Sequence, residues 1–396
     1  MTRIGFFGIL GSGNLGNDGS LEAVVAYVRR RYPDVQLDFL AMGPEQLTER
    51  YQSPATHLQW YEPHAGDATG VRAAALKVLG KLLDPFRTWR WVRKQDVVIV
   101  PGMGVLEATL PIRPWALPYS LLWLGITARM TGAKVALVSV GADYVRKRGT
   151  RWVVSRAAGL AHYRSFRDEH SREALGRMGV DVRDDHVFPD LAFALPDPEP
   201  RPSTGAVGVG LMEFHGGNDD RARAEEINAA YLDTVKRFVR LMVDEGRPVR
   251  LFIGDVADLE VPGEVIADAL AHRPDADITI EPLKSLGDLM RQMAAVDTIV
   301  ATRYHNVLCG LKSAKPMVSF GYARKSDVLM SSMGMADFCQ SAREPDFERL
   351  VALFRRLEQN RDEVVAILEQ RAEEMTSRVE DQFTELSKLV IDGGSS

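Results

Sequence analysis

The chain has 396 residues, of which 45% are hydrophobic and 26% charged, a composition typical of a soluble globular enzyme with room for two domains. Its formal net charge of −5 excludes a general electrostatic attraction to nucleic acid. The two cysteines, Cys309 and Cys339, have no zinc-ligand spacing and suit a reducing compartment. The amino terminus has no signal-peptide pattern and no apolar stretch is long enough to span a bilayer, so we expect a cytoplasmic protein.

The first half of the chain alternates short apolar runs with amphipathic stretches. The apolar runs predict strands, and the stretches with an apolar stripe at helical spacing predict helices. Strands are expected at residues 4–10, 37–41, 96–100 and 134–140. Helices are expected at residues 20–31, 71–94 and 115–131, the second broken at Asp84-Pro85, with an irregular stretch over residues 46–67. This alternation is typical of a parallel sheet.

A proline-rich stretch divides the chain near its middle. Residues 196–204 hold four prolines in nine positions, which predicts a stiff linker. After it the alternation begins again, with strands expected at residues 206–212, 249–253, 278–280, 298–302 and 317–320. We therefore expect an α/β protein with two Rossmann-like, doubly wound domains facing across a cleft. The expected ranges are 1–195 and 205–345 for the domains and 346–392 for C-terminal helices that return to the first domain.

The strongest candidate site lies where the predicted strand 298–302 ends and a helix over residues 307–314 begins. Arg303 and His305 stand at this junction, and in open α/β sheets ligands bind at the carboxyl ends of strands. A helix amino end also favours an anion, because its first N–H groups lack partners. Arg303 adds a permanent charge, and His305 can exchange a proton near neutral pH. The alternative is a structural arginine paired with an acid and a histidine that caps a turn.

Glycine-bearing loops follow other predicted strands. The loop over residues 11–19 resembles a dinucleotide-binding fingerprint but does not match its GxGxxG register. Such a loop is either a tight turn that needs glycine or a place where the backbone approaches a phosphate or a sugar. His215 would face the same cleft as His305, so it is a candidate for ligand contact. The candidate binding residues in these loops are Gly13, Asn14, Gly16, Asn17, Gly102, Gly104, His215 and Gly216.

The end of the predicted helix 71–94 mixes aromatic and basic residues. Residues 86–94 include Phe86, Trp89 and Trp91 among four arginines and lysines. One interpretation is a peripheral contact with an anionic membrane face. The other is a solvated helix with two packed tryptophans.

Four short motifs lie in order along the chain. They are Gly13-Asn14-Leu15-Gly16-Asn17-Asp18, Phe166-Arg167-Asp168-Glu169-x-Ser171 leading to Pro189-Asp190-Leu191-Ala192, Arg303-Tyr304-His305 followed by Lys312 and Pro316, and Tyr322-x-x-Lys325. Together with Gly102-x-Gly104, they resemble the pattern of the polysaccharide pyruvyl transferase family. The chain departs from that pattern at Tyr304, where the family usually has leucine, and at Asn17, which precedes the acid Asp18.

The resemblance implies a GT-B-like fold and transfer of a pyruvyl group from phosphoenolpyruvate to two hydroxyls of a sugar or glycan, forming a ketal. Arg303 and His305 match the family's essential arginine and histidine, and the chemistry requires no metal or other cofactor. The donor's phosphate and carboxylate would be held by Arg303, Lys325 and the N–H groups of the helix that opens at Asn306. Tyr322 is a further candidate binding residue. A lipid-linked acceptor is compatible with this activity.

Two other functions fit the same sequence. A GT-B glycosyltransferase that uses a nucleotide sugar would have the same twin domains. A catalytically silent protein that binds a sugar or a phosphate is the alternative from another class, since fold alone does not determine function.

Overall fold

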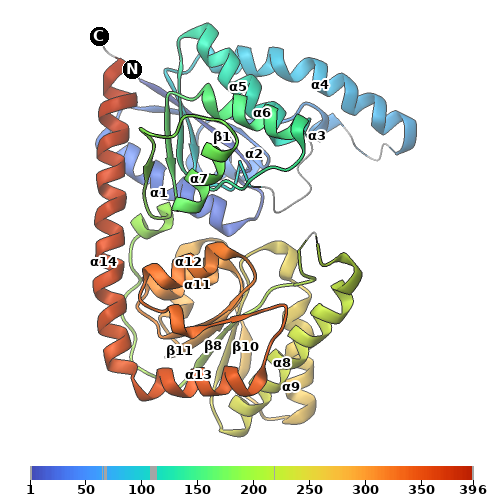
Figure 1. Ribbon diagram of the computed structural model, residues 1–396, viewed down its shortest axis with the longest axis vertical. Helices are drawn as coiled ribbons and strands as arrows, with labels where there is room; N and C mark the ends of the chain where they lie inside the picture. Colours follow the sequence, from blue (N-terminus) through green and yellow to red (C-terminus); the bar gives the residue numbers. More distant parts are fainter. Residues whose placement is uncertain (1, 65, 67–68, 108–113, 218, 395–396) are drawn as a thin grey trace. The chain divides into compact units, whose positions relative to one another are not determined.

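The computed structural model describes residues 2–64, 66, 69–107, 114–217 and 219–394. The chain forms two compact units, each built on a parallel sheet (Figure 1). The first unit comprises Met1–Ser12, Ser20–Leu191 and Arg378–Ser396, and the second Gly13–Gly19 and Ala192–Ser377. The sequence predicts continuous ranges, whereas in the structure the glycine loop Gly13–Gly19 groups with the second unit and Arg378–Ser396 groups with the first.

The sheet of the first unit has seven parallel strands in the order β3-β2-β1-β4-β5-β6-β7. The chain starts at β1, winds outward to β3, and then returns to β4 on the other side of β1. This reversal makes the β1/β4 boundary the switch point of a doubly wound sheet. The strands are β1 (Arg3–Gly8), β2 (Gln36–Ala41), β3 (Ala55–His57), β4 (Val97–Pro101), β5 (Lys134–Val140), β6 (Tyr163–Phe166) and β7 (His186–Val187).

Helices connect these strands, as parallel pairing requires. They are α1 (Leu15–Arg31), α2 (Pro44–Tyr51), α3 (Tyr61–His64), α4 (Gly70–Val92), α5 (Leu117–Thr131), α6 (Arg148–Gly159) and α7 (Glu169–Arg177). Every residue of β4 is buried, which explains why this strand is a continuous apolar run in the sequence.

The sheet of the second unit has six parallel strands in the order β10-β9-β8-β11-β12-β13. The switch point here lies between β8 and β11, so the loops after these two strands are the expected ligand positions. The strands are β8 (Val207–Gly210), β9 (Val249–Phe252), β10 (Ile278–Ile280), β11 (Thr298–Ala301), β12 (Met317–Gly321) and β13 (Cys339–Ser341). The helices are α8 (Ala224–Asp244), α9 (Val261–His272), α10 (Leu286–Met293), α11 (Tyr304–Lys312), α12 (Arg324–Ser332), α13 (Phe347–Gln359) and α14 (Arg361–Leu386).

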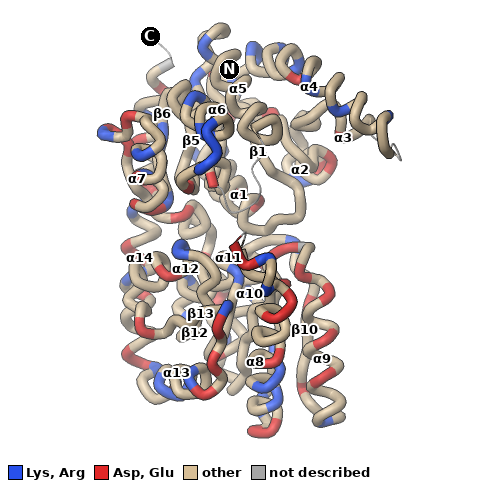
Figure 2. Tube along the Cα trace, turned by 45° about the vertical axis from the view of Figure 1, so that its right-hand side comes forward, with Lys and Arg blue, Asp and Glu red and all other residues tan. Residues whose placement is uncertain are grey.

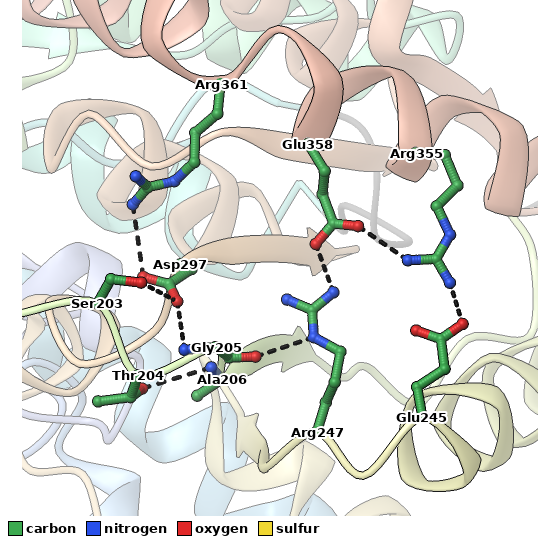
Figure 3. A network of polar contacts seen from close by, with 10 residues as sticks. All are labelled: Ser203, Thr204, Gly205, Ala206, Glu245, Arg247, Asp297, Arg355, Glu358 and Arg361. Atoms are coloured by element: carbon green, nitrogen blue, oxygen red, sulfur yellow. Dashed lines mark hydrogen bonds and ion pairs between the residues drawn. The ribbon is translucent and has the colours of Figure 1, made fainter.

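A polar network joins the start of the second sheet to α13 and α14 (Figure 3). Asp297 precedes β11 and accepts hydrogen bonds from the Ser203 hydroxyl at 2.7 Å and the Gly205 N–H at 2.6 Å. Its other carboxylate oxygen lies 3.4 Å from a guanidinium nitrogen of Arg361, the first residue of α14. The network continues through Arg247, Glu358, Arg355 and Glu245. These contacts fix the end of the linker against the helices that follow the sheet.

The last part of α14, from Arg378 onward, belongs to the first unit. Gln382 is fully buried there, and its amide nitrogen donates to the hydroxyls of Ser139 at 2.8 Å and Ser165 at 2.7 Å. Tyr27 stacks on Phe383 with ring centroids 4.6 Å apart. The helix is thus attached to β5, β6 and α1 of this unit by both polar and apolar contacts.

Two expectations about the region before β4 are wrong. In the stretch expected to be irregular, residues 46–64 contain most of α2 together with β3 and α3, and residues 65 and 67 lie outside the described residues. Leu47 and Tyr51 bury one face of α2, and β3 pairs with the edge strand β2. A helix of eight residues and a strand of three are too short for a hydrophobic periodicity to be recognised in the sequence.

The expected break at Asp84-Pro85 is also wrong, because α4 continues through Pro85. Proline has no N–H, so the carbonyl of Lys81, four residues earlier, loses its helical hydrogen bond. The Tyr119 hydroxyl from α5 donates to that carbonyl at 2.7 Å. A neighbouring helix therefore supplies the donor that the proline removes.

Tyr119→Phe is expected to lower the free energy of unfolding by about 1 kcal/mol, because the Lys81 carbonyl loses its donor. In a Pro85→Ala background the same change should cost less, since the alanine N–H can bond to that carbonyl within the helix. Urea unfolding of the four proteins measures the coupling between the two positions. Equal costs in both backgrounds would show that the tyrosine does not replace the missing helical bond.

In the part of the chain that the structure describes, none of the helices combines the length and the apolar character that a membrane crossing needs.

Candidate functional site

The stretch from Arg303 to Asn306 lies where the sequence predicts it, after β11 and at the beginning of α11. The helix begins at Tyr304, three residues earlier than expected, so His305 and Asn306 belong to its first turn. Arg303 is the residue that precedes the helix and has an extended backbone. This places the four residues at the β8/β11 switch point, beside helix N–H groups that lack intrahelical partners.

Arg303 forms a two-pronged ion pair with Asp258. Its Nε lies 2.7 Å from one carboxylate oxygen and its Nη2 lies 2.8 Å from the other. Asp258 is fully buried and also accepts the Glu213 N–H at 3.0 Å. Burial opposes the charge of Arg303, but the hydrogen-bonded carboxylate outweighs it, so the pKa of Arg303 is raised. Arg303 is thus paired with an acid, as the alternative interpretation of this residue expected. The pair also orients the guanidinium at the strand end.

Asp258 is not among the residues predicted from the sequence. It lies 45 positions before Arg303, in the turn after β9, and its surroundings carry no recognisable motif. Only the pairing of β9 with β8, and of β8 with β11, brings the two residues together.

The glycine loop after β1 contributes to the same unit. Asn14 donates from its amide nitrogen to a carboxylate oxygen of Asp255 at 2.7 Å, and the two residues form an antiparallel bridge. The amide oxygen of Asn14 accepts the Asn17 N–H at 3.1 Å, which caps the beginning of α1. The helix therefore starts at Leu15 and not at the expected residue 20, so Gly16 and Asn17 lie in its first turn.

His305 occupies the space beside Gly16. A Cβ atom on Gly16 would lie 1.9–2.3 Å from three atoms of the imidazole ring, closer than any side chain allows. The ring of Tyr304 meets the His305 ring edge-on, with centroids 5.1 Å apart. The absence of a side chain at Gly16 is thus what admits the imidazole, and two of the predicted motifs meet here.

Tyr304 also contacts a residue of the fourth motif, Lys325. Its side chain is buried, and the ammonium of Lys325 lies 5.5 Å from its ring centroid and 5.9 Å from that of Tyr322. A cation over two aromatic rings is attracted to their electron-rich faces. The residue that departs from the family pattern therefore lies between His305 and Lys325.

Asn306 is fully buried, and neither of its amide atoms has a hydrogen-bonding partner among the described residues. Its amide nitrogen lies against Gly210 and its amide oxygen against Gly254, where a Cβ would come within 2.8 Å and 3.0 Å of them. These glycines end β8 and follow β9. A water molecule or a ligand can complete the amide's hydrogen bonds, since buried polar groups rarely stay unpaired.

Tyr231 is a further hydroxyl near the strand end that the sequence did not reveal. It is fully buried in α8 and lies 2.8 Å from the Thr302 hydroxyl. Burial raises the pKa of Tyr231 to about 12. Tyr231 is therefore a neutral hydroxyl near pH 7 and is unsuited to act as a base.

The remaining candidates have local structural partners. His215 is partly exposed and lies 3.0 Å from a carboxylate oxygen of Glu213, and Gly216 has a φ of +80° that favours glycine. Gly102 and Gly104 belong to the first unit, after β4. Gly102 has a φ of +54°, and a Cβ there would lie 2.3 Å from the Ser20 hydroxyl oxygen. A binding role for these four residues stays a prediction.

The second motif forms a buried cluster of charges in the first unit. The Arg167 side chain is 4% exposed, pairs with Glu107, and lies 3.7 Å from Asp168 and 3.9 Å from Asp190. Asp168 also caps α7 by accepting the Ser171 N–H at 2.7 Å. These contacts give Arg167 a structural role in the first unit, where three carboxylates surround its guanidinium.

A cavity of about 650 Å³ lies elsewhere in the second unit, at the carboxyl end of α11. The linker and the first half of α14 line it, with Lys312, Lys315 and Arg361 facing several acidic side chains. Arg303 and His305 lie at the other end of α11 and do not line it. Among the residues that the structure describes, no group of three or more His, Cys, Asp or Glu could hold a metal ion.

The fold and the strand-end site define an α/β protein of the GT-B type. Solved structures with the same fold include Anabaena Alr3699/HepE in complex with UDP-glucose, with a TM-score of 0.61, 11% identity, and coverage of 99% of this chain and 100% of that chain. The UDP-GlcNAc 2-epimerase from Methanocaldococcus jannaschii has a TM-score of 0.57 and 14% identity, covering 89% of this chain and 91% of that chain. At these identities the similarity shows the fold alone.

The family follows from the sequence match. A family model described as polysaccharide pyruvyl transferase matches residues 14–324, and the chain belongs to this family. The comparison with curated proteins found no match. The matched range contains the second and third motifs completely, and it leaves out only Gly13 of the first motif and Lys325 of the fourth.

Proposed function

We propose that the protein transfers a pyruvyl group from phosphoenolpyruvate to two hydroxyls of a sugar or glycan, forming a pyruvate ketal. The observation that carries this proposal is the position of His305 at the amino end of α11, against Gly16 and beside Tyr304, in a member of the polysaccharide pyruvyl transferase family. An imidazole at the end of a parallel strand can exchange a proton with a ligand that binds there, which supports the proposal.

The donor carries a phosphate and a carboxylate, and the site offers groups that suit both. The first N–H groups of α11 point out of the helix end, where an anion is favoured. Lys325 supplies a positive charge, and Arg303, held by Asp258, supplies guanidinium donors. In this proposal these groups bind the donor, while Asn14 and the glycine loop contribute to binding the acceptor.

The reaction needs one proton donor and one proton acceptor. Protonation of the methylene carbon of phosphoenolpyruvate creates an oxocarbenium-like centre, and a sugar hydroxyl attacks it and loses its proton. Phosphate then leaves with the C–O bonding pair, and the second hydroxyl adds and loses its proton to close the ketal. His305 is the group proposed to serve as the acid toward the carbon or as the base toward the hydroxyl. The remaining residues orient the reactants, which lowers the barrier by fixing their geometry.

Phosphate release from phosphoenolpyruvate, measured against a panel of hexose-bearing acceptors, tests the proposed function. We expect release that depends on one class of acceptor, together with a product that is heavier than the acceptor by the mass of pyruvic acid less one water. Binding of phosphoenolpyruvate without phosphate release, with every acceptor in the panel, would instead support a catalytically silent binding protein.

A nucleotide-sugar donor is the second candidate, because Anabaena Alr3699/HepE, which shares the fold, was solved in complex with UDP-glucose. Ligand-induced thermal stabilisation separates the two donors, since a ligand that binds the folded state raises the melting temperature. Stabilisation by phosphoenolpyruvate and not by UDP-glucose or GDP-sugars is expected. The reverse result would favour a glycosyltransferase.

A further inference from the structure

The first turns of α4 expose an apolar face. Val71, Val78, Leu82 and Phe86 are 87%, 63%, 72% and 59% exposed. Their spacing of seven, four and four residues places them on one side of the helix. From Gly80 onward the opposite side packs, and its buried residues include Gly80, Asp84, Thr88 and Trp91. Figure 1 shows these first turns running out past α5. The face is therefore not part of the core of the first unit.

The charges along this helix are almost all positive. Residues 71–94 contain seven lysines and arginines and one acid, Asp84, whereas the whole chain has a net charge of −5. Asp84 is 4% exposed and lies 3.0 Å from Arg87 and 3.8 Å from Lys81. Lysine and arginine positions, drawn in blue, recur along α4 in Figure 2. The outward charge of this segment is positive and borders the apolar face.

Aromatic and basic side chains also associate at the end of the helix. Phe86 and Trp89 have ring centroids 5.7 Å apart, and the Arg93 guanidinium lies 4.9 Å from the Trp89 ring. Arg72 and Arg90 are exposed and fall on the same edge of the apolar face by helical periodicity. Aromatic rings and arginines with this arrangement suit the boundary between lipid headgroups and acyl chains.

We propose that α4 docks the protein on an anionic lipid surface. The apolar face runs from Val71 to Phe86, a rise of about 22 Å at the helical repeat, so the helix would lie in the plane of the surface. Its apolar side chains enter the acyl boundary, and Arg72, Arg90 and Arg93 contact lipid phosphates. The charge decides the partner, because a second copy of this chain would bring two strongly basic helices together and they would repel.

The docking surface goes beyond the proposed transfer reaction and does not depend on it. It would hold the first unit at a membrane face, where lipid-linked glycans are found. Lipid binding can be measured whether or not the protein releases phosphate from phosphoenolpyruvate, so failure of either idea is visible separately.

Co-sedimentation with vesicles tests the proposal. We expect the full chain to bind vesicles of phosphatidylcholine mixed with phosphatidylglycerol, and to bind phosphatidylcholine alone much more weakly. Added salt should release it, since salt screens the attraction between the arginines and the phosphates. The Leu82→Glu/Phe86→Glu variant should bind at least about tenfold more weakly. Arg72→Gln and Arg90→Gln should each weaken binding roughly fivefold at low salt.

Trp152→Glu is the matched control, because Trp152 on α6 is 59% exposed, as Phe86 is. It should keep full vesicle binding, and circular dichroism should show that each variant is folded. The proposal is overturned if the wild-type chain binds neither vesicle type, if binding is equal on both, or if the control loses binding as the α4 variant does. It is also overturned if light scattering shows a dimer that the Leu82→Glu/Phe86→Glu variant loses while no vesicle is bound.

Discussion

Replacing His305 with alanine is expected to lower phosphate release from phosphoenolpyruvate by at least about 100-fold, because a positioned acid or base contributes on the order of 10²–10⁴ to the rate. The loss should appear in kcat, with a smaller effect on KM, since the imidazole acts mainly in the transition state. Initial rates with the preferred acceptor measure both constants. Full turnover by the folded alanine variant would remove His305 from the chemistry.

Gly16→Ala tests the same role without changing the imidazole. The added Cβ would meet the His305 ring at 1.9 Å, so the ring must move and the rate should fall. Gly263→Ala is a matched control in the first turn of α9, where a Cβ meets nothing within 4 Å. That change should leave the rate unaltered and raise stability slightly, by about 0.4–1 kcal/mol, because alanine restricts the unfolded chain. Equal rates for the two alanine variants would contradict the proposed place of His305.

Asp258→Ala is expected to lower the free energy of unfolding by about 3–5 kcal/mol. It removes the partner of a largely buried guanidinium, and an uncompensated buried charge is costly. The carboxylate is fully buried, and the Arg303 side chain is 23% exposed, so water can replace the lost contact only in part. The Glu213 N–H loses its acceptor as well. Urea denaturation followed by circular dichroism measures the change.

The double variant Asp258→Ala/Arg303→Met shows whether the cost comes from the unpaired charge. Removing the guanidinium should recover much of the stability lost in Asp258→Ala, giving a coupling free energy of more than about 1 kcal/mol. If the two single costs simply add, the ion pair does not stabilise the fold and serves only to orient Arg303. The coupling free energy therefore shows whether the ion pair stabilises the fold or only orients Arg303 in the site.

Some parts of the fold are visible in the sequence because they are buried on both faces. The strands β1, β4, β8 and β11 are apolar runs, and their alternation with helices predicts two parallel sheets. The sequence does not predict the edge strands β3 and β13, of three residues each. Such short segments form strands because they pair with a neighbouring strand, and their own residues show no clear periodicity. The Lys81 carbonyl, which Pro85 leaves without a helical donor, is bonded by the Tyr119 hydroxyl, 38 positions away from Lys81.

The sequence by itself determined the family and the position of Arg303 and His305 at a strand end, since both follow from local motifs and from the order of strands and helices. Only the tertiary structure decided what these residues touch. The partner of Arg303 is Asp258, and the space for the His305 ring is left by Gly16, 289 positions earlier. Such contacts are set by the order of strands in the sheet and by the close approach of a backbone without a side chain, and neither leaves a local pattern in the sequence.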